Sequence, residues 1–200
     1  MLPRTRGEDS SGHAGNVTIK AQNAVILDSL SGLRTYSTGS GSAGNITVEV
    51  PSGSLQVLGG SFINASSLSV GATASKAGDI GVVAGSVLIS GHSTINPSLK
   101  STISASSVTS NGGTIHIDAN KVGLTDSQLT TSVSGGPQTV GGTITVDANN
   151  VKLTNSQMLS TATEGQGGTI DITSHALHQD ANSVIDASSQ FGTDGTVTIH

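Results

Sequence analysis

A five-residue pattern, Gly-x-[Ile/Val]-x-[Ile/Val], recurs along the whole sequence and limits the fold more than any other feature. Its clearest copy is Gly113-Thr114-Ile115-His116-Ile117. The seven copies begin at Gly15, Gly44, Gly78, Gly113, Gly142, Gly168 and Gly195. Subtracting successive glycine numbers gives intervals of 29, 34, 35, 29, 26 and 27 residues. A period of this length is typical of solenoids, propellers and other repeat arrays.

Each copy of the pattern predicts a strand with one buried face. The second and fourth residues after the glycine are β-branched and apolar in every copy, as Ile115 and Ile117 are. Strict alternation puts such residues on one face of a strand and their neighbours on the other. We therefore expect Ile115 and Ile117 to point into the core. His116 should face solvent, and the sequence shows no catalytic partner for it.

Two more short runs complete each repeat. The second run, as in Val122-Gly123-Leu124, ends at a polar corner such as Asp126-Ser127, where side chains can bond their own backbone. The third run has the form Ile103-Ser104-Ala105-Ser106. Longer repeats are accommodated by loops at Val70 to Ala77 and at Gly91 to Lys100, where Pro97 argues against a strand.

Such a repeat can bury its apolar face only against its neighbours. Stacked repeats would pair equivalent strands in parallel, and parallel crossovers are right-handed. The expected fold is therefore all-β: a right-handed parallel β-helix with three short strands per coil and about 26–35 residues per coil. Residues 12–200 would form this single array, and residues 1–11 an irregular N-terminal segment. A propeller needs about 40 residues per blade, so the period is too short for one.

Composition excludes several classes of function. The chain has 10% charged and 2% aromatic residues, with 27 glycines and 4 prolines. A net charge of −5 with eight scattered Lys and Arg residues argues against a nucleic-acid surface. The absence of cysteine excludes disulfides. No run approaches the about 18 apolar residues of a transmembrane segment. The first residues lack the apolar region of a signal peptide.

The seven repeat glycines, Gly15 to Gly195, are interpreted as structural. A tight corner needs either a positive φ or close backbone approach, and glycine permits both. The sequence predicts no catalytic, cofactor-binding or metal-binding role for them.

The repeats resemble those of filamentous haemagglutinin-type exoproteins, the large passengers of bacterial two-partner secretion. The resemblance rests on the patterns G-[NT]-[IV]-T-[IV], [VA]-x-L-x-[DN]-S and I-x-A-S and covers residues 12–200. It implies a right-handed β-helical shaft, export to the cell surface or medium through an outer-membrane transporter, and a role in adhesion or biofilm formation. The secretion domain of that family carries Asn-Pro-Asn motifs. Here only Asn96-Pro97-Ser98-Leu99 occurs, inside the array, so we expect a fragment of a longer protein.

Outward carboxylates and histidines are the candidates for chemistry. Asp118 and Asp147 each lie five residues after a repeat glycine, so they should be neighbours in the stack. Close carboxylates can bind Ca²⁺ or perform acid–base catalysis. The chain has only three aromatic residues that could hold a sugar, Tyr36, Phe62 and Phe191. We therefore interpret Asp118 and Asp147 as solvated surface groups. His175 and His178 lack a third ligand and are not expected to form a metal site.

The sequence therefore predicts a non-enzymatic, monomeric, rod-shaped segment of a secreted or surface adhesin. Its loops would carry contacts with a host-cell or glycan receptor, because loop variation on a rigid scaffold is a general means of recognition. Two alternatives stay open. One is a polysaccharide lyase or hydrolase on the same fold. The other is a structural spacer with no ligand.

Overall fold

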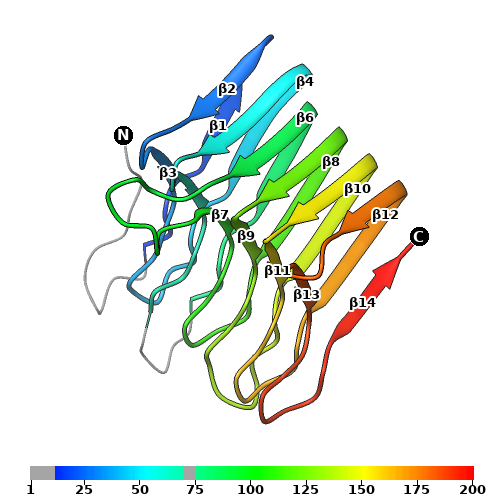
Figure 1. Cartoon of the computed structure of the whole chain (residues 1–200). Helices are drawn as coiled ribbons and strands as arrows, with labels where there is room; N and C mark the ends of the chain where they lie inside the picture. Colours follow the sequence, from blue (N-terminus) through cyan, green and yellow to red (C-terminus); the bar gives the residue numbers. More distant parts are fainter. Residues whose placement is uncertain (1–11, 70–74) are drawn as a thin grey trace.

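The structure is a computed structural model that describes residues 12–69 and 75–200. The predicted irregular segment 1–11 and most of the predicted loop Val70 to Ala77, namely residues 70–74, lie outside the described residues. The described chain winds into a parallel β-solenoid of about six turns, and none of its elements is a helix. Figure 1 shows the coils stacked side by side from the N-terminal to the C-terminal end.

Within residues 12–69 and 75–200, fourteen strands make up the coils. They are β1 (Val17–Lys20), β2 (Ala24–Leu27), β3 (Gly32–Arg34), β4 (Ile46–Leu58), β5 (Phe62–Asn64), β6 (Ile80–Ser90), β7 (Ser101–Ser104), β8 (Thr114–Thr125), β9 (Ser127–Thr130), β10 (Thr143–Thr154), β11 (Gln157–Leu159), β12 (Thr169–Gln179), β13 (Val184–Asp186) and β14 (Thr196–Ile199).

The strands form two parallel sheets. The larger sheet has the order β1-β4-β6-β8-β10-β12-β14, with β2 also paired to β4. The smaller has the order β13-β11-β9-β7-β5-β3. Equivalent residues pair from coil to coil, as Ile144 does with Ile115 and with Ile170. Equivalent strands of successive coils therefore lie side by side, which confirms the parallel β-helix predicted from the repeats.

In the coils from β4 to β12 the first two predicted strands join into one, whereas β1 and β2 stay separate. In β8 the residues alternate between buried and exposed up to Ala119, and two exposed residues, Asn120 and Lys121, then reverse the alternation. Neither residue is a glycine or proline. The ladder between β8 and β10 continues past this bend, and the only position without a paired partner there is Asn120. The coil thus consists of a long bent strand and a short strand, joined by loops.

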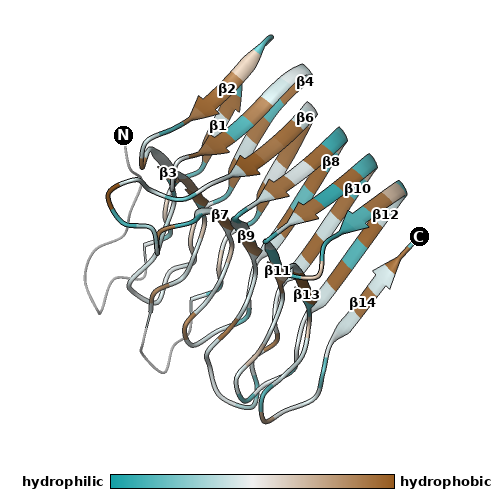
Figure 2. Ribbon diagram, viewed as in Figure 1, coloured by the Kyte–Doolittle hydropathy of each residue, from teal (hydrophilic) through white to brown (hydrophobic). Residues whose placement is uncertain are grey.

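Columns of apolar side chains fill the interior. Ile115, Ile117, Val122, Leu124 and Leu129 of one coil are almost completely buried, and the equivalent residues of the neighbouring coils stack on them. Figure 2 shows the resulting apolar bands recurring at the same places on successive strands. Branched aliphatic side chains are suited to this arrangement because they pack closely across the about 4.8 Å between paired strands. The inward orientation predicted for Ile115 and Ile117 is confirmed.

Candidate functional site

The repeat glycines form one corner of each coil, which we call the glycine corner (Gly44, Gly78, Gly113, Gly142, Gly168 and Gly195). None of them has a positive φ. A Cβ atom added to Gly142 would lie 2.0 Å from the carbonyl oxygen of Gly113, and one added to Gly113 would lie 2.0 Å from that of Gly78. Close approach of backbone to backbone, rather than an unusual φ, therefore explains these glycines.

Hydrogen bonds lock the glycine corner. The amide of Gly142 donates to the carbonyl of Thr131 at 2.9 Å, and that of Gly113 donates to Ala105 at 2.8 Å. The buried hydroxyl of Ser160 donates to the Gly142 carbonyl at 2.6 Å. Because the backbone groups at this corner have partners and the space is filled, it offers no surface for a ligand.

The opposite turn, between the long and the short strand, is the polar corner (Gly59, Gly91, Asp126 and Asn155). All four residues have a positive φ, between 48° and 76°. Glycine adopts this conformation without strain, and Asp and Asn tolerate it better than other residues. A buried serine follows each turn, and these serines bond across coils, as the Ser127 amide does to the Ser156 hydroxyl at 3.2 Å. The sequence predicted these turns from Asp126-Ser127 and Asn155-Ser156.

The predicted loop from Gly91 to Lys100 emerges from this polar corner. Its two ends meet in an antiparallel bridge between His92 and Lys100. The Ser93 amide donates to the Leu99 carbonyl at 2.9 Å, which closes the loop on itself. The side chains of Ile95 and Leu99 are 84% and 48% exposed. The loop is therefore a closed projection with an apolar tip in solvent.

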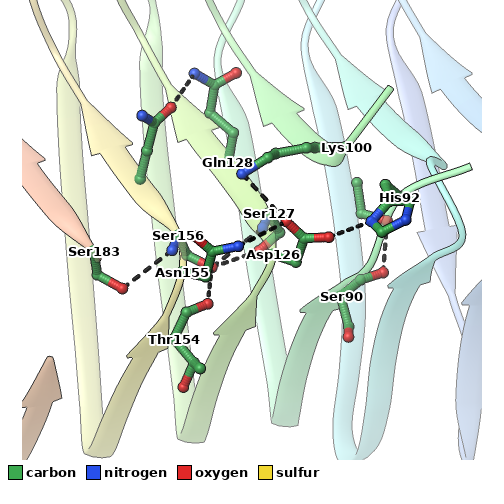
Figure 3. A network of polar contacts seen from close by, with 12 residues as sticks. Ser90, His92, Lys100, Asp126, Ser127, Gln128, Thr154, Asn155, Ser156 and Ser183 are labelled. Atoms are coloured by element: carbon green, nitrogen blue, oxygen red, sulfur yellow. Dashed lines mark hydrogen bonds and ion pairs between the residues drawn. The ribbon is translucent and has the colours of Figure 1, made fainter. Parts of the chain in front are cut away.

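A network centred on Asp126 fixes this loop to the next coil (Figure 3). The carboxylate pairs with His92, and its other oxygen lies 3.3 Å from Lys100 Nζ. The Asn155 amide donates to the same oxygen at 3.2 Å. The hydrogen bond from His92 and the nearby Lys100 ammonium lower the pKa of Asp126, although partial burial opposes this. Asp126 thus holds both ends of the loop.

The candidate carboxylates Asp118 and Asp147 are direct neighbours in the ladder between β8 and β10. Both line a shallow hollow of about 530 Å³, together with His175 at the bend of β12. His178 lies on the outer face of β12, opposite Lys152. The described residues contain no group of three or more His, Asp or Glu side chains arranged to hold a metal ion.

His116, for which the sequence shows no catalytic partner, is exposed and lies near one carboxylate. Its Nδ1 lies 3.8 Å from Asp147 Oδ2, which is an ion pair when the ring is protonated but too long for a hydrogen bond. The contact is diagonal: His116 is opposite Thr145 in the ladder, and Asp147 is two residues further along the same face. Both side chains are about half exposed, at 47% and 44%, so water screens the interaction.

Sequence analysis missed the partners of Asp126. His92 and Asp126 are 34 residues apart, so only superposition of the polar corners, Gly91 on Asp126, could have brought them together.

Comparison with protein-family models, curated proteins and solved structures gives no match. In the described part of the chain, no helix has the length and apolar character needed to cross a membrane.

Proposed function

We propose that this chain is a shaft segment of a secreted or cell-surface adhesin of the filamentous haemagglutinin type. The stacked coils serve as a stiff rod, and loops at the polar corner present the groups that contact another cell. The observation that carries the proposal is the loop His92–Lys100, which is tied to the rod at both ends while its apolar tip faces solvent.

In this proposal the stacked coils provide rigidity and the loop provides the binding surface. Parallel ladders across successive coils make the rod rigid, because each long strand is bonded to a neighbour on either side. A loop anchored to such a rod loses little further entropy on binding, which favours affinity. Exposed aliphatic groups such as Ile95 are suited to a protein contact.

Exchange of the loop tests this proposal. Residues 93–99 would be replaced by a Gly-Ser segment of equal length, with His92 and Lys100 retained so that both anchors stay. Beads coated with the protein would be counted on cultured host cells and on bacterial cells. We expect the exchange to lower adhesion several-fold with no change in far-UV circular dichroism. Equal adhesion by both proteins would exclude a role for this loop.

Cleavage of a polysaccharide is the second candidate function. The observation in its favour is the adjacency of Asp118 and Asp147 in an open hollow, because glycoside hydrolysis uses a pair of carboxyl groups about 5–10 Å apart. The activity would release new reducing ends from acidic polysaccharides. It would be lost in Asp118→Ala or Asp147→Ala, whereas persistence in both variants would exclude this pair as the catalytic groups.

A further inference from the structure

Two of the three aromatic residues of the chain lie close together, and Phe191 lies apart from them. The two, Tyr36 and Phe62, gather around Arg34, the single arginine among the described residues. The guanidinium carbon lies 4.8 Å from the centre of the Phe62 ring and 5.5 Å from that of Tyr36. These distances are within the about 6 Å range of a cation–π contact. All three side chains are half-buried on the outer face of the smaller sheet.

Backbone register creates this cluster. Phe62 pairs with Gly32 in the ladder between β3 and β5, and a Cβ atom on Gly32 would lie 2.3 Å from two atoms of the Phe62 ring. The missing side chain at Gly32 is what lets the ring lie flat against β3. Arg34 pairs with Asn64 in the same ladder. The ring therefore covers β3 and holds the guanidinium beside it.

The fold does not need this cluster. Further along the same sheet, the position of Phe62 is occupied by Thr102, Gln128 and Gln157. Those coils stack in the same register with polar residues there. Three large side chains on two neighbouring coils, in a chain that is 2% aromatic, are thus not required for the stacking that stabilises the solenoid.

The guanidinium is free to bind an anion. Within residues 12–69 and 75–200 no carboxylate lies within ion-pair distance of Arg34, and its side chain makes no hydrogen bond there. Its cation–π contacts are with the Phe62 and Tyr36 rings. Such contacts use the face of a ring and not the N–H groups of the guanidinium, which can therefore bind a carboxylate in a bidentate manner.

A groove lies next to this cluster, because Asn64, which pairs with Arg34 in the ladder between β3 and β5, is one of its lining residues. Its shallow hollow of about 390 Å³ begins at Asn64 and Ser66 and continues over Ser104, Ser106 and Ser132 on successive coils. The coils repeat every about 4.8 Å, and each contributes serine or asparagine side chains to the lining, although Ser66 and Ser104 are mostly buried and hydrogen-bonded to each other. A linear, repeating ligand could engage several coils at once, with its charged group at Arg34.

We infer that Arg34, Tyr36 and Phe62 form a binding site for a linear acidic polysaccharide. The uronate carboxylate binds the Arg34 guanidinium, the sugar rings lie against the aromatic side chains, and the chain continues along the serine groove. A glycan fits this surface better than an acidic peptide because the groove offers hydroxyls and no backbone edge. The site goes beyond the proposed adhesin function, since none of its residues belongs to the loop 92–100.

Affinity electrophoresis with alginate in the gel tests the inference on the whole chain. We expect alginate to retard the protein, and Arg34→Gln to raise the dissociation constant about tenfold or more, as loss of a charge-assisted hydrogen bond implies. Phe62→Leu should weaken binding less. The matched control is Lys152→Gln, which removes one exposed positive charge from another face. It should bind as the wild type does, as should Ile95→Ser at the loop tip.

Four results would overturn the inference. They are no retardation by alginate, equal weakening by Arg34→Gln and Lys152→Gln, equal retardation by neutral hydroxyethylcellulose, or equal retardation by poly-glutamate. The last would assign the site to an acidic protein instead. Loss of alginate binding in Ile95→Ser would place the ligand on the loop. Thermal unfolding of each variant confirms that a lost interaction does not reflect a lost fold.

Discussion

The glycine corner and the polar corner turn the same chain in the same coil, yet they respond differently to sequence change. At the glycine corner the backbones of successive coils approach so closely that a Cβ atom has no room. At the polar corner the backbone has a positive φ, and glycine, aspartate or asparagine occupies the turn in different coils, as at Gly91, Asp126 and Asn155. One corner therefore fixes the stack, and the other admits the nine-residue insertion from His92 to Lys100.

The largest effect should come from adding one methyl group at the glycine corner. Gly142→Ala would place Cβ about 2.0 Å from the Gly113 carbonyl oxygen and 2.6 Å from Thr131 Cβ. Because both neighbours are buried, we expect a loss of about 3 kcal/mol in the free energy of unfolding. Urea unfolding would measure it.

The matched control is Gly81→Ala, on β6, where an added Cβ would have no heavy atom within 4 Å. It should keep or slightly raise stability, by about 0.5 kcal/mol, since alanine restricts the unfolded chain. Equal destabilisation by the two variants would refute the close-approach explanation of the glycine corner.

A smaller effect is expected at the polar corner. Asn155 has a φ of 49° and bonds Asp126. Asn155→Ala should cost about 1–2 kcal/mol, because alanine is strained in this conformation and the hydrogen bond is lost. Asn155→Gly loses the same hydrogen bond without the strain, so the difference between the two variants is the strain minus the extra unfolded-chain entropy of glycine, which the Gly81→Ala variant measures. If both variants unfold at the same urea concentration, the positive φ is not what selects the residue here.

The smallest effect should be that of Asp126→Asn, which keeps a residue suited to its φ of 48° but removes the charge that holds the loop. We expect a loss of about 0.5–1 kcal/mol near neutral pH. The pKa of Asp126 is lowered in the folded state, chiefly by His92, from a usual value of 3.8. Its contribution is therefore complete above pH 3.8 and is lost as pH falls through the lowered pKa.

The thermal midpoints of wild type and Asp126→Asn should consequently differ at pH 6 and converge at acid pH, below the lowered pKa of Asp126. His92 and Lys100 are the charged groups that face Asp126. A difference that stays constant down to acid pH would mean that the carboxylate charge does not anchor the loop.

The sequence was sufficient to predict the coil and the direct neighbours in the ladder, such as Asp118 and Asp147, but not diagonal contacts or contacts made by the inserted loop. Ile115 and Ile117 could be placed in the core because strict alternation recurs in every repeat. The joining of the first two strands was not predicted, because nothing in Asn120-Lys121 distinguishes a bend within a ladder from a loop. The contact of His116 with Asp147 is diagonal, and alternation alone does not reveal diagonal neighbours.

The arginine cluster was missed for a related reason. Arg34 and Phe62 are 28 residues apart and meet only when Gly32-Leu33-Arg34 is superposed on Phe62-Ile63-Asn64. The first of these runs contains a glycine and an arginine, so it lacks the Ile-x-Ala-Ser pattern that marked the third strand elsewhere. Alignment by ladder position, rather than by residue type, would have brought the two together.

In the proposed adhesin, the rod presents its polar corner outside the cell. The most direct test is an immunoblot of the native source, separated into cytoplasm, outer membrane and medium, with an antibody raised against residues 92–100. We predict a signal in the outer membrane or the medium. The antibody should also bind intact cells or the released protein in its folded state. A signal confined to the cytoplasm would contradict the adhesin proposal.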